Sequence, residues 1–447
     1  MLKDAWTLAI EALSWIELQN LSERLALSKT AEQLGITDLS AKGLANRLVY
    51  ETMRSKNLID SLINTTLKPH TLSDYELGIG AFLRLYVYKT RIEHKGDVHK
   101  EAIEIARMGR SILGWQTLQP VEKTLGTLLS LKLEKIFENL SDVEKAALNT
   151  NNPTWFVEYC FRLFGRKEAL DFLASSQESL PMYIQVNTLK VQEERAIEAL
   201  QNEGVDVEKV PELLHAYKVK ETKRPLVSTN SFKEGLFYVQ DNASCLAVEV
   251  AAPDSDMVVF DVCAAPGAKT TNLAVLMQNK GVIYSFDYSR RRMSAWKHCI
   301  ARRGVKNALP LIADVRKPLP VNGTADLVIL DPPCTSTGVF ARIPSAKWRL
   351  TPQSMAKMAM IQWQMLRNCS EKVRESGWLV YCTCSISVEE NEMQIERFLR
   401  VYPEFRLAEI KPWIGSPGLR GLVKCQRLYP HIHGCNGFFI AKLQKEA

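Results

Sequence analysis

The feature that most constrains the fold is a series of short apolar runs that alternate with helical segments from about Glu234 onward. The runs are MVVFDVC, GVIYSFD, LPLIAD, ADLVILD and GWLVYCTC, and each ends in a polar or small residue. Alternating strands and helices are typical of a parallel sheet with helices on both faces, whose ligand site lies at the carboxyl ends of the strands. The sequence therefore predicts a doubly wound α/β domain over residues 234–447, with a site at these strand ends.

Two different regions precede this domain. Residues 1–148 contain only Pro69 and Pro120, and their apolar residues recur at three- and four-residue spacing, which predicts an all-helical domain. Residues 149–233 combine a helix from Trp155, a β-like YIQVNTLKV and a helix in EERAIEALQNEG. This pattern predicts a small α+β module between the two larger domains.

Composition excludes several classes of protein. No apolar run approaches the roughly 18 residues that a membrane span needs, and the first residues lack a secretory cleavage pattern, so we expect a cytoplasmic protein. The ten cysteines form no C-x-x-C pair, which favours reduced thiols over a disulfide scaffold. The net charge of +7 is compatible with a polyanionic partner but does not establish one.

A small-residue turn after the first strand is the candidate cofactor site. Such a turn lets backbone N–H groups and a helix N-terminus approach a ligand closely. Asp287, Asp314 and Asp331 follow later strands; one such aspartate is more often a helix cap, but three in succession favour binding. Neither a Walker loop nor a G-x-G-x-x-G dinucleotide pattern is present. The candidate turn consists of Cys263, Ala264, Ala265, Pro266, Gly267, Ala268 and Lys269.

Two cysteines stand at strand ends, Cys334 in DPPCTST and Cys384 in YCTCS. Most strand cysteines are buried core residues, which is the interpretation for Cys382. Cys384 lies where its apolar run stops and Cys334 follows two prolines, so both are candidates for a reactive pair in the crevice. A thiolate that adds to carbon 6 of a cytosine activates carbon 5 for methylation, and a second acid or base must assist release.

The motifs together resemble the Sun-type (RsmB/NSUN) RNA cytosine-C5 methyltransferases, over nearly the whole chain. They are YVQDNAS, DVCAAPGAKT, DPPCTSTG, YCTCSISVEENE and RLYPHIHGCNGFFIAKL, together with the acidic Asp287 and Asp314. The resemblance implies a Rossmann-like methyltransferase domain that uses S-adenosyl-L-methionine. The helical region resembles the NusB-like RNA-binding domain of the RsmB-like branch, and the middle module resembles the family's substrate-binding subdomain.

The resemblance also implies roles for the candidate residues. Cys384 would attack carbon 6 and Cys334 would assist product release. The Cys263–Lys269 turn would hold the methionine and ribose part of the cofactor, Asp287 the ribose hydroxyls and Asp314 the adenine side, while Asp331 would lie between the cofactor amino group and the base. We expect RNA as the partner, ribosomal RNA before transfer RNA, and a monomer without metal.

Some residues depart from the family pattern or offer other interpretations. Ala268 replaces a second glycine, Gln185 a common arginine and Asn436 a common aspartate. The candidate RNA contacts are the arginine-rich segment YSRRRMSAWKHCIARRG, which is equally compatible with a solvated helix, and Phe340, Arg342 and Trp348. Cys425, His431, His433 and Cys435 match no usual zinc spacing.

Two other functions remain as alternatives. One is a non-catalytic RNA-binding assembly factor that keeps the fold without turnover, although Cys384 and the cofactor carboxylates are present. The other is DNA cytosine methylation, in which the attacking cysteine usually follows a proline, so that Cys334 would be the nucleophile and Cys384 would be idle.

Overall fold

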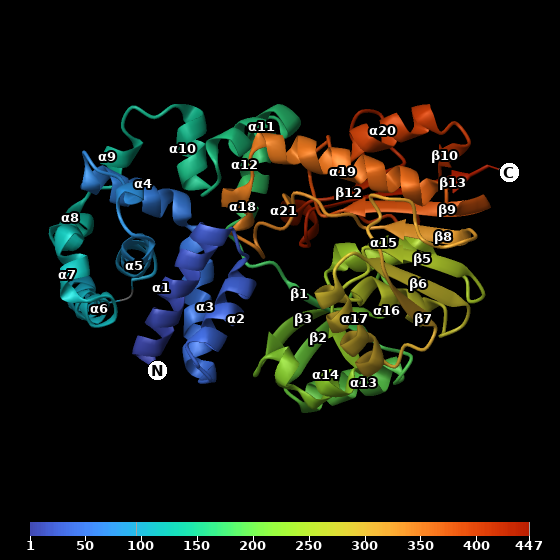
Figure 1. Ribbon diagram of the computed structural model, residues 1–447, viewed down its shortest axis with the longest axis horizontal. Helices are drawn as coiled ribbons and strands as arrows, with labels where there is room; N and C mark the ends of the chain where they lie inside the picture. Colours follow the sequence, from blue (N-terminus) through green and yellow to red (C-terminus); the bar gives the residue numbers. More distant parts are fainter. Residues whose placement is uncertain (95, 447) are drawn as a thin grey trace. The chain divides into compact units, whose positions relative to one another are not determined.

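The computed structural model describes residues 1–94 and 96–446, which form two compact units (Figure 1). The helical unit consists of Met1–Ser179 together with Phe340–Leu350, and the second unit holds Leu180–Val339 and the chain from Thr351 on. The helices α11 (Thr154–Phe164) and α12 (Arg166–Ser175) therefore belong with the N-terminal helices, and the three-part division at residues 149 and 234 stays a prediction.

The helical unit confirms the expected run of helices. Local capping explains several of their starts: Asp38 accepts hydrogen bonds from the backbone of Ser40 and Ala41, and Ser141 and Glu144 form a capping box. The helices are α1 (Leu2–Gln19), α2 (Glu23–Gln33), α3 (Leu39–Arg54), α4 (Lys56–Leu67), α5 (Leu77–Val87), α6 (Val98–Leu113), α7 (Trp115–Leu118), α8 (Glu122–Ser130), α9 (Glu134–Phe137), α10 (Asp142–Asn149), α11 (Thr154–Phe164), α12 (Arg166–Ser175) and α18 (Ala346–Arg349).

The segment Phe340–Leu350 is far from the N-terminus in sequence, yet it completes the helical unit. The carboxylate of Glu23 in α2 accepts hydrogen bonds from the backbone and the hydroxyl of Ser345, and all these groups are fully buried. The buried Lys347 ammonium donates to the Asn151 carbonyl and to Ser176, each at 3.0 Å. We call this segment the inserted strap.

The second unit contains a small antiparallel sheet of order β2-β3-β1-β4. Its strands are β1 (Met182–Val186), β2 (Val205–Lys209), β3 (Ala216–Thr222) and β4 (Phe237–Val239), and its helices are α13 (Glu193–Asn202) and α14 (Asn230–Glu234). The strand in YIQVNTLKV and the helix that follows it lie where the sequence predicted them. Ile184, Leu200 and Phe237 meet in the core between strands and helices.

The large sheet has the order β11-β12-β13-β9-β8-β5-β6-β7, with β10 beside β13. Strands β5 to β9 pair in parallel, as the alternation of strand and helix predicted, whereas β10 to β13 are antiparallel, which the sequence did not predict. The strands are β5 (Val258–Val262), β6 (Val282–Asp287), β7 (Ala308–Ile312), β8 (Ala325–Leu330), β9 (Val373–Thr383), β10 (Phe405–Leu407), β11 (Ser416–Pro417), β12 (Gln426–Leu428) and β13 (Phe438–Lys445).

Helices cover both faces of this sheet (Figure 1). One core joins α15 and α16 to strand residues such as Val259 and Ile329, and the other joins α19 and α20 to Phe260 and Leu330. Neighbouring residues of a strand point to opposite faces of the sheet, and both faces are covered by helices. This explains why these runs are apolar throughout. The helices are α15 (Asn242–Ala251), α16 (Ala268–Leu276), α17 (Arg290–Arg303), α19 (Pro352–Ser370), α20 (Glu392–Val401) and α21 (Pro430–His433).

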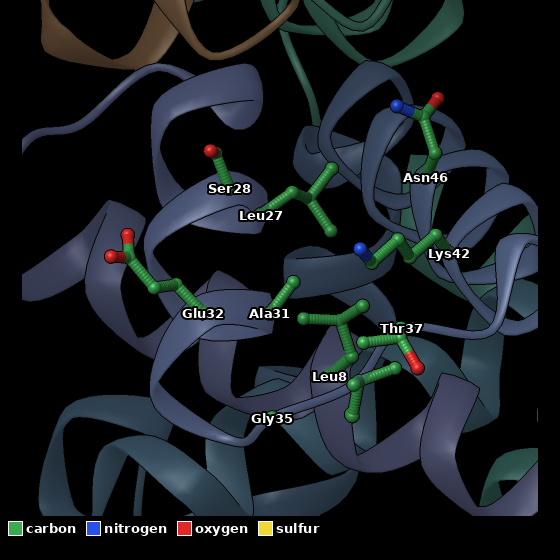
Figure 2. Close-up of a pocket in the computed structure, with 10 residues that line it drawn as sticks. Leu8, Leu27, Ser28, Ala31, Glu32, Gly35, Thr37, Lys42 and Asn46 are labelled. Atoms are coloured by element: carbon green, nitrogen blue, oxygen red, sulfur yellow. The ribbon is translucent and has the colours of Figure 1, made fainter.

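Within the described part of the chain, no helix has the length and apolar character needed to cross a membrane. Figure 2 shows a hollow in the helical unit between α1, α2 and α3. Leu8 and Ala31 contribute apolar surface to it, while Glu32, Lys42 and Asn46 contribute polar groups. Its lining contains neither a cysteine nor a histidine. The candidate cofactor turn and both candidate cysteines lie in the second unit.

Candidate active site

The carboxyl ends of the parallel strands bring the predicted site residues to one edge of the large sheet. The neighbouring strands β9, β8 and β5 are followed directly by Cys384, Asp331 and Cys263. Asp287 ends β6, and Asp314 lies two residues after β7. A doubly wound sheet forms its ligand crevice at this edge.

The turn from Cys263 to Lys269 has the backbone shape that small residues allow. Cys263 and Gly267 have positive φ angles of 68° and 104°. A Cβ atom on Gly267 would lie 3.0 Å from Cδ1 of Trp296, so the glycine lets the turn approach α17 closely. Ala264 and Ala265 pack on the same helix. The peptide bond before Pro266 is cis, and Ala268 begins α16.

Asp287 is buried and only partly satisfied by the protein. The Ser289 backbone N–H donates to its Oδ1 at 3.0 Å, and the Nη1 atom of Arg292 lies 3.1 Å from its Oδ2. This Oδ2 atom nevertheless accepts no hydrogen bond of acceptable geometry among the described residues. A buried carboxylate oxygen with spare acceptor capacity suits the hydroxyl of a ligand.

Lys269 and Asp331 form an ion pair between the turn and the end of β8, with 2.6 Å between Nζ and Oδ2. Burial opposes the ammonium charge, but the charge of Asp331 outweighs it and raises the pKa of Lys269. The ion pair joins the turn to the strand end that precedes Cys334.

Asp261 lies inside β5 and was missed by the sequence analysis, although an acid within the apolar run VVFDV was a visible signal. Its carboxylate accepts a hydrogen bond of 2.5 Å from Thr270, whose hydroxyl accepts one from the indole of Trp296. Burial raises the pKa of Asp261 to about 6. These hydrogen bonds connect the start of α16 to β5 and to α17.

Asp314 is half-buried and bound by Arg316. The guanidinium donates to both carboxylate oxygens, at 2.9 Å to Oδ1 and 2.7 Å to Oδ2, and these hydrogen bonds lower the pKa of Asp314. The carboxylate thus stays charged at the end of β7, the outermost strand of the parallel part.

The two candidate cysteines are in contact. The Sγ atoms of Cys334 and Cys384 lie 3.1 Å apart, and Ser336 Oγ is 3.7 Å from Cys384 Sγ. Both side chains are partly exposed. The hydrogen bond with Cys384 and burial raise the pKa of Cys334 well above the usual thiol value. Cys334 therefore keeps its proton and can donate it to a thiolate on Cys384.

A buried glutamate that the sequence analysis did not single out lies behind this pair. Glu390 is fully buried, and its Oε2 accepts hydrogen bonds from the Thr335 N–H at 2.9 Å and from Gln362 at 2.8 Å. Its Oε1 accepts from the hydroxyls of Ser385, at 2.6 Å, Ser387 and Thr335. The glutamate-rich VEENE was visible in the sequence, but nothing local distinguished Glu390 from the partly exposed Glu389 before it.

Several candidate RNA contacts take other roles. Phe340 is buried and packs edge-on against Phe156, so the prediction that this ring contacts a base is wrong. Trp348 is only partly buried and its indole donates to the Met53 carbonyl at 2.8 Å, so its contact with a base stays a prediction. Gln185 is fully buried and donates to the Leu214 carbonyl, which removes it from any surface contact.

The helix α17 carries the predicted arginine-rich segment. Arg303 is buried over the Tyr238 ring, and Arg302 lies over Phe232, so both stabilise the fold. Arg290 and Arg291 are exposed. Among the described residues no group of three or more ligating side chains could hold a metal ion, and Cys425 and Cys435 are buried.

Two family models match the second half of the chain and the region before it. Residues 248–444 match the model of the 16S rRNA methyltransferases RsmB/F, and residues 153–242 match that of the N-terminal domain of the 16S rRNA methyltransferase RsmF. Together they cover the large sheet and most of the region between it and the first helices.

Similar proteins agree with these models. A probable ribosomal RNA small subunit methyltransferase B from Bacillus subtilis is 29% identical, covering 98% of each chain. A tRNA (cytosine(72)-C(5))-methyltransferase from Pyrococcus horikoshii is 39% identical over 220 residues, which are 49% of this chain and 55% of that protein.

Two solved structures share the fold. The crystal structure of PH0851 covers 100% of this chain and 99% of its own, with 31% identity and a TM-score of 0.83. The structure of NSun6 from Pyrococcus horikoshii with SFG covers 66% of this chain and 98% of its own, with 29% identity and a TM-score of 0.62. The chain therefore belongs to the Sun-type family of RNA cytosine-C5 methyltransferases.

Proposed function

We propose that this enzyme methylates carbon 5 of a cytosine in RNA through a covalent adduct between Cys384 and carbon 6. The observation that carries the proposal is the contact of two thiols, Cys334 and Cys384, in the segments that follow the adjacent strands β8 and β9 and that also carry the Asp331 of the Lys269–Asp331 pair. A lone reactive cysteine would fit many reactions. Two thiols in contact, one of which keeps its proton, fit a reaction in which one sulfur adds to the base and the other assists its release.

The residues of the crevice suit S-adenosyl-L-methionine. The spare acceptor on Asp287 would bind the ribose hydroxyls, the Cys263–Lys269 turn would accommodate the methionine and ribose part, and Asp314 the adenine side. Asp331, which forms an ion pair with Lys269, would lie between the cofactor amino group and the base. When bound, the cofactor supplies the methyl group and leaves as S-adenosylhomocysteine. NSun6 with SFG, an analogue of this cofactor, supports the assignment.

The residues of this chain perform the remaining steps. The Cys384 thiolate forms a bond to carbon 6, and the electron pair that moves to carbon 5 takes up the methyl group. A base then removes the proton from carbon 5, the double bond reforms, and the bond to sulfur breaks. The Cys334 thiol, 3.1 Å away, donates a hydrogen bond to the departing thiolate and makes it a better leaving group.

Ribosomal RNA is the proposed substrate, because the relative that matches the whole chain is named for ribosomal RNA. Transfer RNA is the second candidate, favoured by the relative that methylates a tRNA cytosine. The helical region 1–148 would bind RNA as a NusB-like domain, and residues 149–233 would help to hold the substrate. The cytoplasm as the place of action and the monomeric state stay predictions.

Trapping of a protein–RNA adduct tests the mechanism. Native protein, Cys334→Ala and Cys384→Ala are incubated with S-adenosyl-L-methionine and with ribosomal or transfer RNA, and adducts are resolved on denaturing gels. We expect an adduct to accumulate with the single variant Cys334→Ala. It should be absent from the double variant that carries both Cys334→Ala and Cys384→Ala.

The competing activities give different results in the same assay. An adduct that depends on Cys334 and persists in Cys384→Ala would reverse the roles and favour the DNA-type mechanism. Cofactor binding without adduct or methyl transfer on any RNA would favour a non-catalytic assembly factor. The RNA that forms the adduct decides between the two substrate classes.

A further inference from the structure

Glu390 is a buried carboxylate for which the proposed reaction has no direct use. It is 0% exposed, and among the described residues it forms no ion pair with a lysine or arginine. A buried charge without a counter-ion is costly unless hydrogen bonds replace its hydration. The molecule keeps this charge at one specific place, directly behind the two thiols, which calls for a reason beyond packing.

The hydrogen bonds of Glu390 connect the two loops that carry the thiols. One set comes from Thr335, the residue after Cys334, through both its backbone N–H and its hydroxyl. Another comes from Ser385, the residue after Cys384, at 2.6 Å. One carboxylate thus binds the next neighbour of each reactive residue.

Further contacts make this arrangement rigid. Gln362 in α19 donates to Glu390 and to the Pro333 carbonyl, at 2.8 and 3.0 Å, and so fixes the residue on the other side of Cys334. The Gly338 N–H donates to the Cys384 carbonyl at 3.0 Å. Because charge-assisted hydrogen bonds are stronger than neutral ones, the carboxylate is the strongest link between the loops.

We propose that Glu390 is the positioning residue of the thiol pair, and that its buried carboxylate holds the sulfur atoms of Cys334 and Cys384 in contact. This inference rests on the proposed two-cysteine function. The negative charge has a second effect. The hydrogen bond with Cys384 and burial are the main causes of the raised pKa of Cys334, and the charge of Glu390 adds to them in the same direction. Glu390 itself touches no substrate.

Two substitutions separate the geometric effect from the electrostatic one. Glu390→Ala removes every link that runs through the carboxylate and leaves the direct links between the loops, such as the hydrogen bond from Gly338 to Cys384. Glu390→Gln keeps the volume and some hydrogen bonds, since the hydroxyls around Oε1 can rotate to accept from an amide, but it removes the charge. Glu389→Gln removes one charge at the preceding, partly exposed residue and serves as the matched control.

The geometry is measured on the full-length free enzyme with phenylarsine oxide, whose trivalent arsenic bonds two adjacent thiols and releases water. Native protein should bind the arsenical through the pair, and Cys334→Ala should define the background. We expect Glu390→Ala to bind the arsenical at least about tenfold more weakly, which means a dissociation constant about ten times larger. Glu389→Gln should bind like the native protein.

The charge effect is measured by iodoacetamide alkylation of Cys334 over a range of pH, with the modified residue identified by mass spectrometry. In Glu390→Gln, Cys334 should ionise at lower pH and react faster at neutral pH, by about tenfold for each unit of pKa decrease. Thermal unfolding of each variant is recorded beside these assays. A residue that merely supported the fold would change the melting temperature without this shift in the pH profile.

Unchanged arsenical binding by a folded Glu390→Ala, or an unchanged alkylation profile in Glu390→Gln, would overturn the proposal. If Glu390→Ala does not fold, the alkylation profile of Glu390→Gln decides. Both assays use the enzyme without RNA. A failure of methyl transfer in the native protein would therefore contradict the proposed function and leave the test of Glu390 intact.

Discussion

At the scale of single residues, the inserted strap contains an unusual buried cation. Burial, reinforced by the charge of Arg54, lowers the pKa of Lys347 to about 7 from its ordinary value of 10.5. Between these two values the unfolded chain binds a proton that the folded chain does not. The free energy of unfolding must therefore rise with pH across this range, and the destabilisation is fully present below about pH 7.

Lys347→Met should remove this pH dependence from the stability of the protein. For one group, the slope between about pH 7 and pH 10 can reach about 1.4 kcal/mol per unit. Urea unfolding over this range measures it as the difference between native protein and variant. The exposed Lys145→Met is the control and should keep the native slope. If the free energy of unfolding changes with pH in the same way for the native protein and for Lys347→Met, the prediction is contradicted.

At the scale of elements, the end of β9 and the loop after β8 are held together by a close backbone approach. Gly338 donates to the Cys384 carbonyl at 3.0 Å, and its own carbonyl accepts from the Gly437 N–H at 2.8 Å. A Cβ atom at Gly338 would lie 2.1 Å from the Gly437 carbonyl oxygen. Only a glycine permits this approach, so the position of both thiol loops depends on it.

Gly338→Ala should separate the loops. The rate of methyl transfer should fall even under conditions in which the variant is still folded. We expect a loss of about 1–3 kcal/mol in the free energy of unfolding, typical of overpacking. Methyl transfer and urea unfolding are measured in parallel. Gly43→Ala in α3, whose Cβ would meet nothing within 4 Å, should keep native activity. Native activity in Gly338→Ala would show that the loops tolerate displacement.

At the scale of the whole molecule, the chain divides in a way that departs from its linear order. The inserted strap leaves the second unit after Val339 and completes the core of the helical unit before the chain returns at Thr351. Cys334, the proposed release residue, therefore stands a few residues in sequence from a segment that folds with the N-terminal helices. Without the strap, the carboxylate of Glu23 would lose the donors of Ser345.

A fragment of residues 1–179 should accordingly be less stable alone than with a peptide of residues 340–350. An unsatisfied buried charged group costs more than about 1–3 kcal/mol, so we expect the peptide to raise the melting temperature of the fragment. Circular dichroism at increasing peptide concentration measures this. A peptide with Trp348→Ala, which cannot donate to the Met53 carbonyl, should stabilise less. An identical melting temperature with and without peptide would contradict the prediction.

The sequence by itself determined the helices, the parallel strands and the edge of the sheet at which the site lies. Periodicity and turn composition are local properties, so they identified strands β5 to β9 and the Cys263–Lys269 turn directly. The positions of Cys334 and Cys384 at strand ends followed from the same pattern, and the parallel register then brought them to one edge.

Only the tertiary structure decided the contacts on which the chemistry depends. The 3.1 Å contact between the thiols joins residues fifty positions apart, and the role of Glu390 arises from donors contributed by three separate segments. Phe340 and Trp348 were candidate RNA contacts because local sequence cannot show that their segment packs with helices far away in the chain. Long-range packing, which no local pattern encodes, determines which polar groups are buried together and hence which residues hold the site.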